Sequence, residues 1–140
     1  MSIPKQIHQI WIGDKQPPYK WLNSWSESKL HRILWREKDI DDFCLDNRDK
    51  YDYLYKKKDF AGASDIARVE ILYELGGVFL DADSVCIKHF DNESFMNSDF
   101  FSVLEYDRRV ANGTIGCIHH HPIMKLYKER IKESTVIEPP

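Results

Sequence analysis

The stretch ASDIARVEILYELGGVFLDAD, residues 63–83, decides the fold class of this chain. Within it, residues 64–75 predict a helix, because Ser64 is a favourable N-cap and Asp65 suits the positive end of a helix dipole. The apolar residues of this segment recur at helical spacing and predict a broad buried face: Ile66, Val69, Leu72, Tyr73 and Leu75. The segment is therefore expected to pack as a core helix beside a sheet.

A short strand is expected to follow this helix directly. Gly76-Gly77 is typical of a helix end, and the apolar residues 78–80 predict a strand that runs into Asp81-Ala82-Asp83. Apolar runs bounded by turn residues predict four more strands, at residues 3–12, 32–35, 100–105 and 114–118.

Helices are expected between these strands. Residues 19–29 and 39–58 show helical spacing, and Pro122 favours the start of a last helix. The side chains of that last helix expected to face inward are Ile123, Leu126, Tyr127 and Ile131. Because strand and helix alternate, the fold class is predicted to be α/β with a largely parallel sheet, in a single domain over residues 1–140.

Composition excludes several classes of protein. The 140 residues are 42% hydrophobic and 31% charged, as in soluble globular domains and unlike disordered chains. The formal net charge is -3, so no global basic field favours nucleic acid as a partner. The basic run Lys56-Lys57-Lys58 is interpreted as a solvated face, with peripheral contact to an anionic membrane surface as the alternative.

Cysteine usage and the N-terminal sequence suggest a reducing compartment. Cys44, Cys86 and Cys117 are odd in number, widely spaced and without a CxxC pair, so we expect buried or half-buried free thiols. The start, MSIPKQIHQIWIG, lacks the layout of a signal peptide, and no run approaches the roughly 20 apolar residues that span a bilayer. A cytoplasmic protein is expected.

Two carboxylates mark the end of the predicted strand 78–80. In an open α/β sheet, ligands bind outside the carboxyl ends of the strands. Asp81 and Asp83 are therefore placed to share a ligand, and hard cations such as Mg²⁺ and Mn²⁺ take carboxylate and phosphate oxygens. A DxD sequence alone is weak evidence, because solvated turns often contain it.

Other polar and aromatic residues leave two interpretations open. Asp65 and Arg68 are three apart, so they share a helix face, either as a surface ion pair or as groups that hold sugar hydroxyls. Trp11 is either a core residue or a ring that stacks on a nucleotide base. His119-His120-His121 is interpreted as a loop before Pro122, because adjacent side chains rarely converge on one metal.

Three blocks, IPKQIHQIWIG, ASDIARVEILYELGGVFLDAD and ANGTIGCIHHHP, occur in that order. Together they resemble the DXD-containing sugar-binding glycosyltransferases, the family 32 group with yeast-type mannosyltransferases, bacterial capsule enzymes and, distantly, the catalytic domains of large clostridial toxins. The resemblance covers roughly residues 3–130, and its specific part is the SDxxR helix followed by GG and a strand into DxD.

The resemblance implies a GT-A-like fold and a retaining hexosyltransferase that uses Mn²⁺ or Mg²⁺ and a UDP- or GDP-sugar donor. It implies a glycan or glycolipid acceptor. The catalytic residues would be Asp65 and Arg68, with Asp83 as direct metal ligand and Asp81 close to the metal. The donor-binding residues would be Trp11, Ser64, Asp65, Arg68, Asp81 and Asn112.

Members of that family usually run well past residue 140, with a C-terminal part that closes over the donor. We therefore expect a GT-A-like fold that lacks this part, and two functions remain open: an active glycosyltransferase, or a non-catalytic module that binds a nucleotide sugar. A hydrolytic phosphotransferase is a third, weaker alternative. No P-loop pattern GxxxxGK[ST] is present, which argues against a nucleotide triphosphatase.

Overall fold

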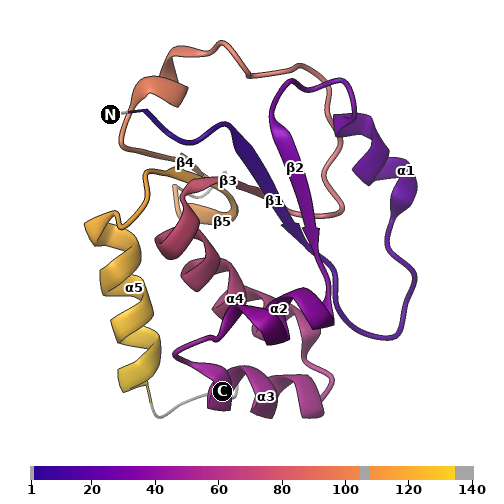
Figure 1. Ribbon diagram of the computed structural model, residues 1–140, viewed down its shortest axis with the longest axis vertical. Helices are drawn as coiled ribbons and strands as arrows, with labels where there is room; N and C mark the ends of the chain where they lie inside the picture. The colour runs from indigo at the N-terminus through magenta and orange to yellow at the C-terminus, as the bar shows by residue number, and fades with distance from the viewer. Residues whose placement is uncertain (1, 105–107, 135–140) are drawn as a thin grey trace.

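The computed structural model describes residues 2–104 and 108–134. A five-stranded sheet in the order β2-β1-β3-β5-β4 forms its centre (Figure 1). The strands are β1 (Gln6–Ile10), β2 (His31–Trp35), β3 (Gly77–Leu80), β4 (Phe100–Leu104) and β5 (Val110–Cys117). Each of the five predicted strands is thus present, although β1 is shorter and β5 longer than expected. Glu105, the last residue of the predicted fourth strand, lies outside the described residues.

The sheet is mixed, not largely parallel as expected. β1 pairs in parallel with β2 and with β3, whereas β5 runs antiparallel to both β3 and β4. A parallel neighbour needs a long crossover connection, whereas antiparallel neighbours can be joined by a short turn. Residues 105–109 are too few for such a crossover, so β4 and β5 form an antiparallel hairpin.

Helices cover one face of the sheet and irregular chain covers the other (Figure 1). The helices are α1 (Tyr19–Leu22), α2 (Glu37–Phe43), α3 (Arg48–Lys56), α4 (Phe60–Leu75) and α5 (Pro122–Glu133), with short 3-10 turns η1 (Asn23–Trp25) and η2 (Ser94–Asn97). A larger core lies between the sheet and α2–α5. A smaller core lies on the opposite face, under η1, η2 and the chain between β3 and β4.

Helix α4 begins earlier than predicted. Its N-cap is Asp59, whose side chain accepts a hydrogen bond from the Gly62 backbone at 2.9 Å, so Ser64 lies inside the helix and caps nothing. The predicted apolar face is also too narrow, because every residue from 66 to 72 is buried. Leu75, by contrast, is 39% exposed. The predicted end is confirmed: Gly76 follows the last helical residue with φ 66°, a conformation that favours glycine.

The phase of α5 differs from the prediction. His121 caps the helix and Pro122 starts it, and this phase turns Met124 into the core. Ile131, seven residues later on the same face, packs against the core as expected. The inward placement was wrong for three other side chains, which are 48%, 52% and 38% exposed: Ile123, Leu126 and Tyr127.

The helix predicted over residues 19–29 is much shorter than expected, since only α1 and the 3-10 turn η1 form there, and the other predicted features fit with small changes. Residues 39–58 form two helices instead of one, because Cys44 adopts a left-handed φ of 62° and ends α2. The free thiols Cys86 and Cys117 are half-buried and buried, as expected, whereas the free thiol Cys44 is exposed, because it lies at the end of α2. Lys56, Lys57 and Lys58 are exposed at the end of α3. Among the described residues, no helix combines the length and apolar character needed to cross a bilayer.

Candidate functional site

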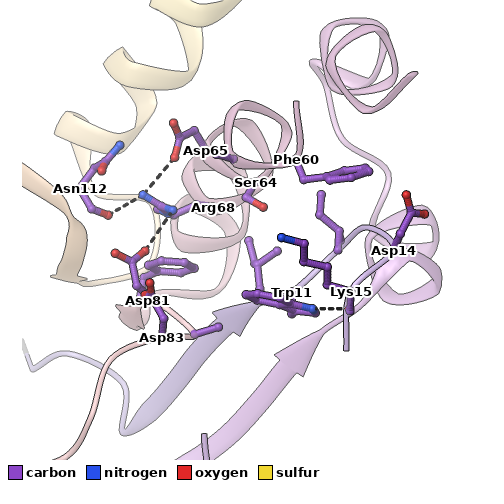
Figure 2. Close-up of a pocket in the computed structure, with 15 residues that line it drawn as sticks. Trp11, Asp14, Lys15, Phe60, Ser64, Asp65, Arg68, Asp81, Asp83 and Asn112 are labelled. Atoms are coloured by element: carbon purple, nitrogen blue, oxygen red, sulfur yellow. Dashed lines mark hydrogen bonds and ion pairs between the residues drawn. The ribbon is translucent and has the colours of Figure 1, made fainter. Parts of the chain in front are cut away.

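A pocket of about 560 Å³ opens at the carboxyl ends of β1 and β3 (Figure 2). Its lining comes from the loop after β1, the first half of α4, the turn after β3 and the middle of β5. All of the residues proposed from the sequence line it: Trp11, Ser64, Asp65, Arg68, Asp81, Asp83 and Asn112. The sheet topology thus brings together side chains that lie up to about a hundred residues apart, at the edge where ligands bind in open α/β sheets.

Arg68 organises the inner wall of the pocket. Its side chain is only 7% exposed, and one terminal nitrogen lies 2.7 Å from the Asn112 carbonyl oxygen and 3.2 Å from Asp65 Oδ1. The other lies 3.5 Å from Asp81 Oδ1, and the guanidinium carbon lies 4.1 Å from the centre of the Phe79 ring. We call Asp65, Arg68, Asp81 and Asn112 the arginine cluster. The sequence analysis left open that Asp65 and Arg68 form only a surface ion pair. Arg68 is buried, so this pair does not lie at the surface.

Negative charge exceeds positive charge in this wall. Burial raises the pKa of Asp65, Arg68 opposes the rise, and Asp81 and Asp59 add to it. Burial also raises the pKa of Asp81, against the effect of Arg68, and the nearby Asp83 raises it further. One arginine therefore does not neutralise the three carboxylates of this wall, Asp65, Asp81 and Asp83, and a bound cation would stabilise their ionised forms.

The turn after β3 presents Asp83 to solvent. Ser84 closes the turn with its backbone N–H and its hydroxyl, which donate to the Asp81 carbonyl oxygen at 3.0 and 2.6 Å. Ala82 is buried, so the two carboxylates flank it at the pocket edge, and Asp83 is exposed. Across residues 2–104 and 108–134, no group of three or more His, Cys, Asp or Glu side chains could hold a metal. A carboxylate pair fits Mg²⁺ or Mn²⁺ that takes its other ligands from phosphate and water.

Gly113 is a site residue that the sequence analysis missed. A Cβ atom at this position would lie 2.4 Å from Asp81 Oδ2, so any other residue would force the carboxylate to shift from its present position. The Gly113 carbonyl oxygen also accepts a hydrogen bond from the Asp81 backbone at 3.0 Å. A glycine inside a strand often marks such a close approach, and that signal was present in the block ANGTIG.

The opposite wall of the pocket is the loop of residues 11–15, which we call the loop wall. Trp11 is partly exposed and lines the pocket, and its indole Nε1 donates to the Lys15 carbonyl oxygen at 2.9 Å. Gly13 has φ 106°, and a Cβ there would lie 2.6 Å from the ring of Phe60, another lining residue. Trp11 is therefore a pocket residue and not a core residue.

A carboxylate outside the pocket holds this loop. Glu37 Oε2 accepts hydrogen bonds from the Gly13 backbone N–H at 3.0 Å and from the Tyr55 hydroxyl at 2.8 Å. Burial would raise the pKa of Glu37, but these hydrogen bonds and Arg36 outweigh it and leave the pKa lowered. No motif joins Glu37 and Tyr55 in the sequence, so sequence analysis had no signal for them.

The histidine triplet serves the start of α5. The Ile123 backbone N–H donates to the ring of His121 at 3.0 Å, which makes this histidine the N-cap. His119 and His120 stack with ring centres 3.5 Å apart, and His120 also stacks on Tyr73. The structure thus assigns these rings to the strand-to-helix connection.

Known proteins with similar sequences identify the family of this chain. An uncharacterized glycosyltransferase of Acanthamoeba polyphaga mimivirus is 33% identical over 133 residues, which cover 86% of this chain and 52% of the relative. Inositol phosphoceramide mannosyltransferase 1 of Schizosaccharomyces pombe is 32% identical over 103 residues, 64% of this chain and 31% of that protein. The chain thus spans about half, or less, of these relatives.

A solved structure shares the fold. The PaToxG glycosyltransferase superposes with a TM-score of 0.76 at 19% identity, over 97% of this chain and 63% of that one. This likeness confirms the predicted GT-A-like α/β fold. The family model of the glycosyltransferase sugar-binding region containing the DXD motif matches residues 5–101, which are 97 of the 140 residues. The chain belongs to this family of DXD-containing glycosyltransferase sugar-binding regions.

Proposed function

We propose that the pocket binds a UDP- or GDP-sugar with Mn²⁺ or Mg²⁺ and transfers the sugar, with retention of configuration, to a glycan, lipid or protein acceptor. One observation carries this proposal: the aromatic residues Trp11 and Phe60 lie on one side of the pocket, and the arginine cluster lies on the other (Figure 2). A nucleotide sugar has a flat base at one end and a hydroxyl-rich sugar at the other, which matches this distribution.

Each wall has a proposed role. The Trp11 ring stacks on the base, since every base offers a π-face. Asp65 accepts hydrogen bonds from sugar hydroxyls, with Ser64 and Asn112 beside it. Asp83 is the direct metal ligand, with Asp81 next to it, and a cation there would neutralise charge on the leaving diphosphate.

Arg68 acts in this proposal chiefly by positioning other groups. Both of its terminal nitrogens already contact Asp65, Asp81 and the Asn112 carbonyl oxygen. It therefore fixes the two carboxylates in the orientation in which they meet the sugar and the metal. Such fixed charges need no reorganisation during the reaction, which is the main source of electrostatic stabilisation in enzymes.

Exposure of Asp83 favours a second candidate, donor binding without transfer. Water at the diphosphate weakens the electrostatic interactions on which transfer depends. For both candidates we propose a cytoplasmic location, which the three free thiols support.

The test is a panel of UDP- and GDP-sugars, each titrated with Mn²⁺ or with EDTA, with the melting temperature as the readout. A donor at 100 times its Kd stabilises the folded state by about 2.7 kcal/mol. Asp83→Asn should abolish the gain that Mn²⁺ adds, whereas Asp42→Asn, an exposed aspartate on α2, should keep it. Equal gains in both variants would refute the metal assignment.

Transfer is measured separately, with a radiolabelled donor and glycan acceptors. Asp65→Asn should lower transfer at least tenfold while donor still binds. Binding by the unsubstituted chain without any transfer or hydrolysis would favour the non-catalytic candidate.

A further inference from the structure

The diphosphate of the proposed donor needs a positive protein group that the arginine cluster does not supply. Arg68 would be the expected phosphate ligand, yet its terminal nitrogens contact two carboxylates and a carbonyl oxygen. Its side chain is also 7% exposed and stacked on Phe79. Moving Arg68 to a phosphate would break these contacts and leave Asp65 and Asp81 uncompensated.

Lys15 is the other cationic side chain that lines the pocket. Its backbone is fixed, because its carbonyl oxygen accepts the indole N–H of Trp11 at 2.9 Å. Its side chain points from the loop wall into the pocket (Figure 2). Within the part of the chain that the structure describes, the Lys15 ammonium forms no ion pair.

We infer that Lys15 binds the diphosphate of the nucleotide sugar; the inference rests on the proposed function and adds a residue to it. The hydrogen bond from the Trp11 indole to the Lys15 carbonyl oxygen links base binding to diphosphate binding. The ring that stacks on the base also holds the backbone from which the Lys15 side chain extends. In a nucleotide sugar, one ribose separates the diphosphate from the base. The Lys15 side chain starts beside Trp11, where the base would stack, and its four methylenes are long enough to bring the ammonium to the diphosphate.

The charges of the pocket support this assignment. The lining holds four aspartates, Asp14, Asp65, Asp81 and Asp83, against two cationic side chains, Lys15 and Arg68. A doubly charged diphosphate would meet strong repulsion in such a pocket unless cations stood next to it. A metal at Asp83 and the ammonium of Lys15 would hold the diphosphate from two sides. Lys15 would then stabilise the charge that stays on the nucleoside diphosphate when the sugar leaves.

The experiment compares ligands that differ only in phosphate. Uridine, UMP and UDP, and guanosine, GMP and GDP, are titrated by calorimetry into the full chain with Mn²⁺ and with EDTA. The variants are Lys15→Met, Lys15→Arg and the control Lys20→Met, an exposed lysine of α1 outside the pocket lining. All these positions are exposed, so the variants are expected to fold.

A charge-assisted hydrogen bond makes the expected loss about ten- to hundredfold in diphosphate affinity for Lys15→Met. Nucleoside affinity should stay within about twofold, and Lys15→Arg should recover most of the loss. The loss should persist in EDTA and shrink at high salt, because the contact is ionic. Lys20→Met should behave as the unsubstituted chain does.

Two results would overturn the inference while leaving the proposed function intact: unchanged diphosphate affinity in Lys15→Met, or an equal loss for nucleoside and diphosphate. The second result would place Lys15 at the base. If the unsubstituted chain binds none of the nucleotides, with or without Mn²⁺, the proposed function fails and the role of Lys15 fails with it.

Discussion

The two walls of the pocket are built in opposite ways. In the arginine cluster, the buried guanidinium of Arg68 holds the half-exposed carboxylates of Asp65 and Asp81, and the residues come from α4, the end of β3 and β5. The loop wall has no regular structure of its own, and it is held from behind by Glu37 and Tyr55. One wall is thus fixed by charge pairs to a buried guanidinium, whereas the other depends on a few hydrogen bonds to a loop.

Because of this difference, substitutions in the two walls should affect global stability and ligand affinity to different extents. Groups in the core are part of what folds the chain, so changes there should affect both stability and ligand affinity. Loops open at lower cost than core elements, so changes behind the loop wall should affect ligand affinity more than global stability.

Removal of the guanidinium should have the largest effect. Arg68→Met keeps apolar contact with Phe79 but leaves Asp65 and Asp81 without their cation. We expect a loss of about 3 kcal/mol in the free energy of unfolding, the lower end for a broken buried pair, because both carboxylates are half-exposed. Urea denaturation measures it.

A matched arginine outside the pocket provides the control. Arg48 pairs with Asp41 and Asp52 at the surface, with a side chain that is 37% exposed. Arg48→Met should cost less than about 1 kcal/mol. If the two variants lose the same stability, the arginine cluster is an ordinary surface pair and the comparison between the walls fails.

Gly113 tests the geometry of the arginine cluster without removing a charge. In Gly113→Ala the new methyl group would collide with Asp81 Oδ2. We expect a loss of about 1 kcal/mol in unfolding free energy, as for overpacking, and about a tenfold loss of Mn²⁺-dependent donor affinity. In an Asp81→Ala background the same change should cost almost nothing, because the colliding group is gone. Equal costs in both backgrounds would show that Gly113 does not position Asp81.

The loop wall should respond differently. Glu37→Ala leaves the Gly13 N–H and the Tyr55 hydroxyl without their shared acceptor. We expect a loss of about fivefold in nucleoside affinity, about 1 kcal/mol, with the additional gain from Mn²⁺ unchanged. Glu37→Gln keeps an acceptor oxygen and should lie near the unsubstituted chain. Calorimetry with uridine and guanosine measures the effect, and a larger loss of Mn²⁺ dependence than of nucleoside affinity would contradict it.

Sequence alone could predict most of the arginine cluster, because three of its four residues are close in the chain. Asp65, Arg68 and Asp81 fall within 17 residues, and helix, glycine stop and strand place them at one sheet edge, whereas Asn112 follows much later. Periodicity also predicted α4 and the five strands. The antiparallel direction of β5 relative to β3 could not be predicted, because the pattern of apolar residues in a strand does not show which strand it pairs with.

The loop wall could be predicted only at Trp11. Glu37, Tyr55 and Phe60 reach it from three later helices, α2, α3 and the start of α4, with no shared motif. The start of α4 was misplaced for a similar reason: Asp59 and Ser64 are both good caps, and only the contact from Gly62 decides between them. Likewise, the side of α5 that faces inward follows from the packing of Met124 in the larger core and not from the number of apolar residues in the helix.

The smallest expected effect is a pH dependence confined to the arginine cluster. Asp65 and Asp81 have raised pKa values in the folded chain, chiefly through burial. Between the unfolded pKa, about 3.9, and the raised folded pKa, the folded chain binds more protons, so these groups favour folding at low pH and lose that contribution as pH rises. The effect should stay below about 1 kcal/mol, because both side chains are about half exposed to solvent.

The readout is a difference between melting curves from pH 4 to pH 7. Other groups also contribute to the pH dependence in this range, among them Glu70, whose pKa is raised by burial, so the Asp81→Asn variant serves as reference and Asp42→Asn as control. The melting temperature of the unsubstituted chain minus that of Asp81→Asn should fall as pH rises. With Mn²⁺ and UDP or GDP the slope should reverse, because a metal binds the ionised carboxylate and competes with the proton. If this difference in melting temperature does not change with pH, with or without the ligands, then burial does not raise the pKa of Asp81 and Asp81 does not lie next to the metal.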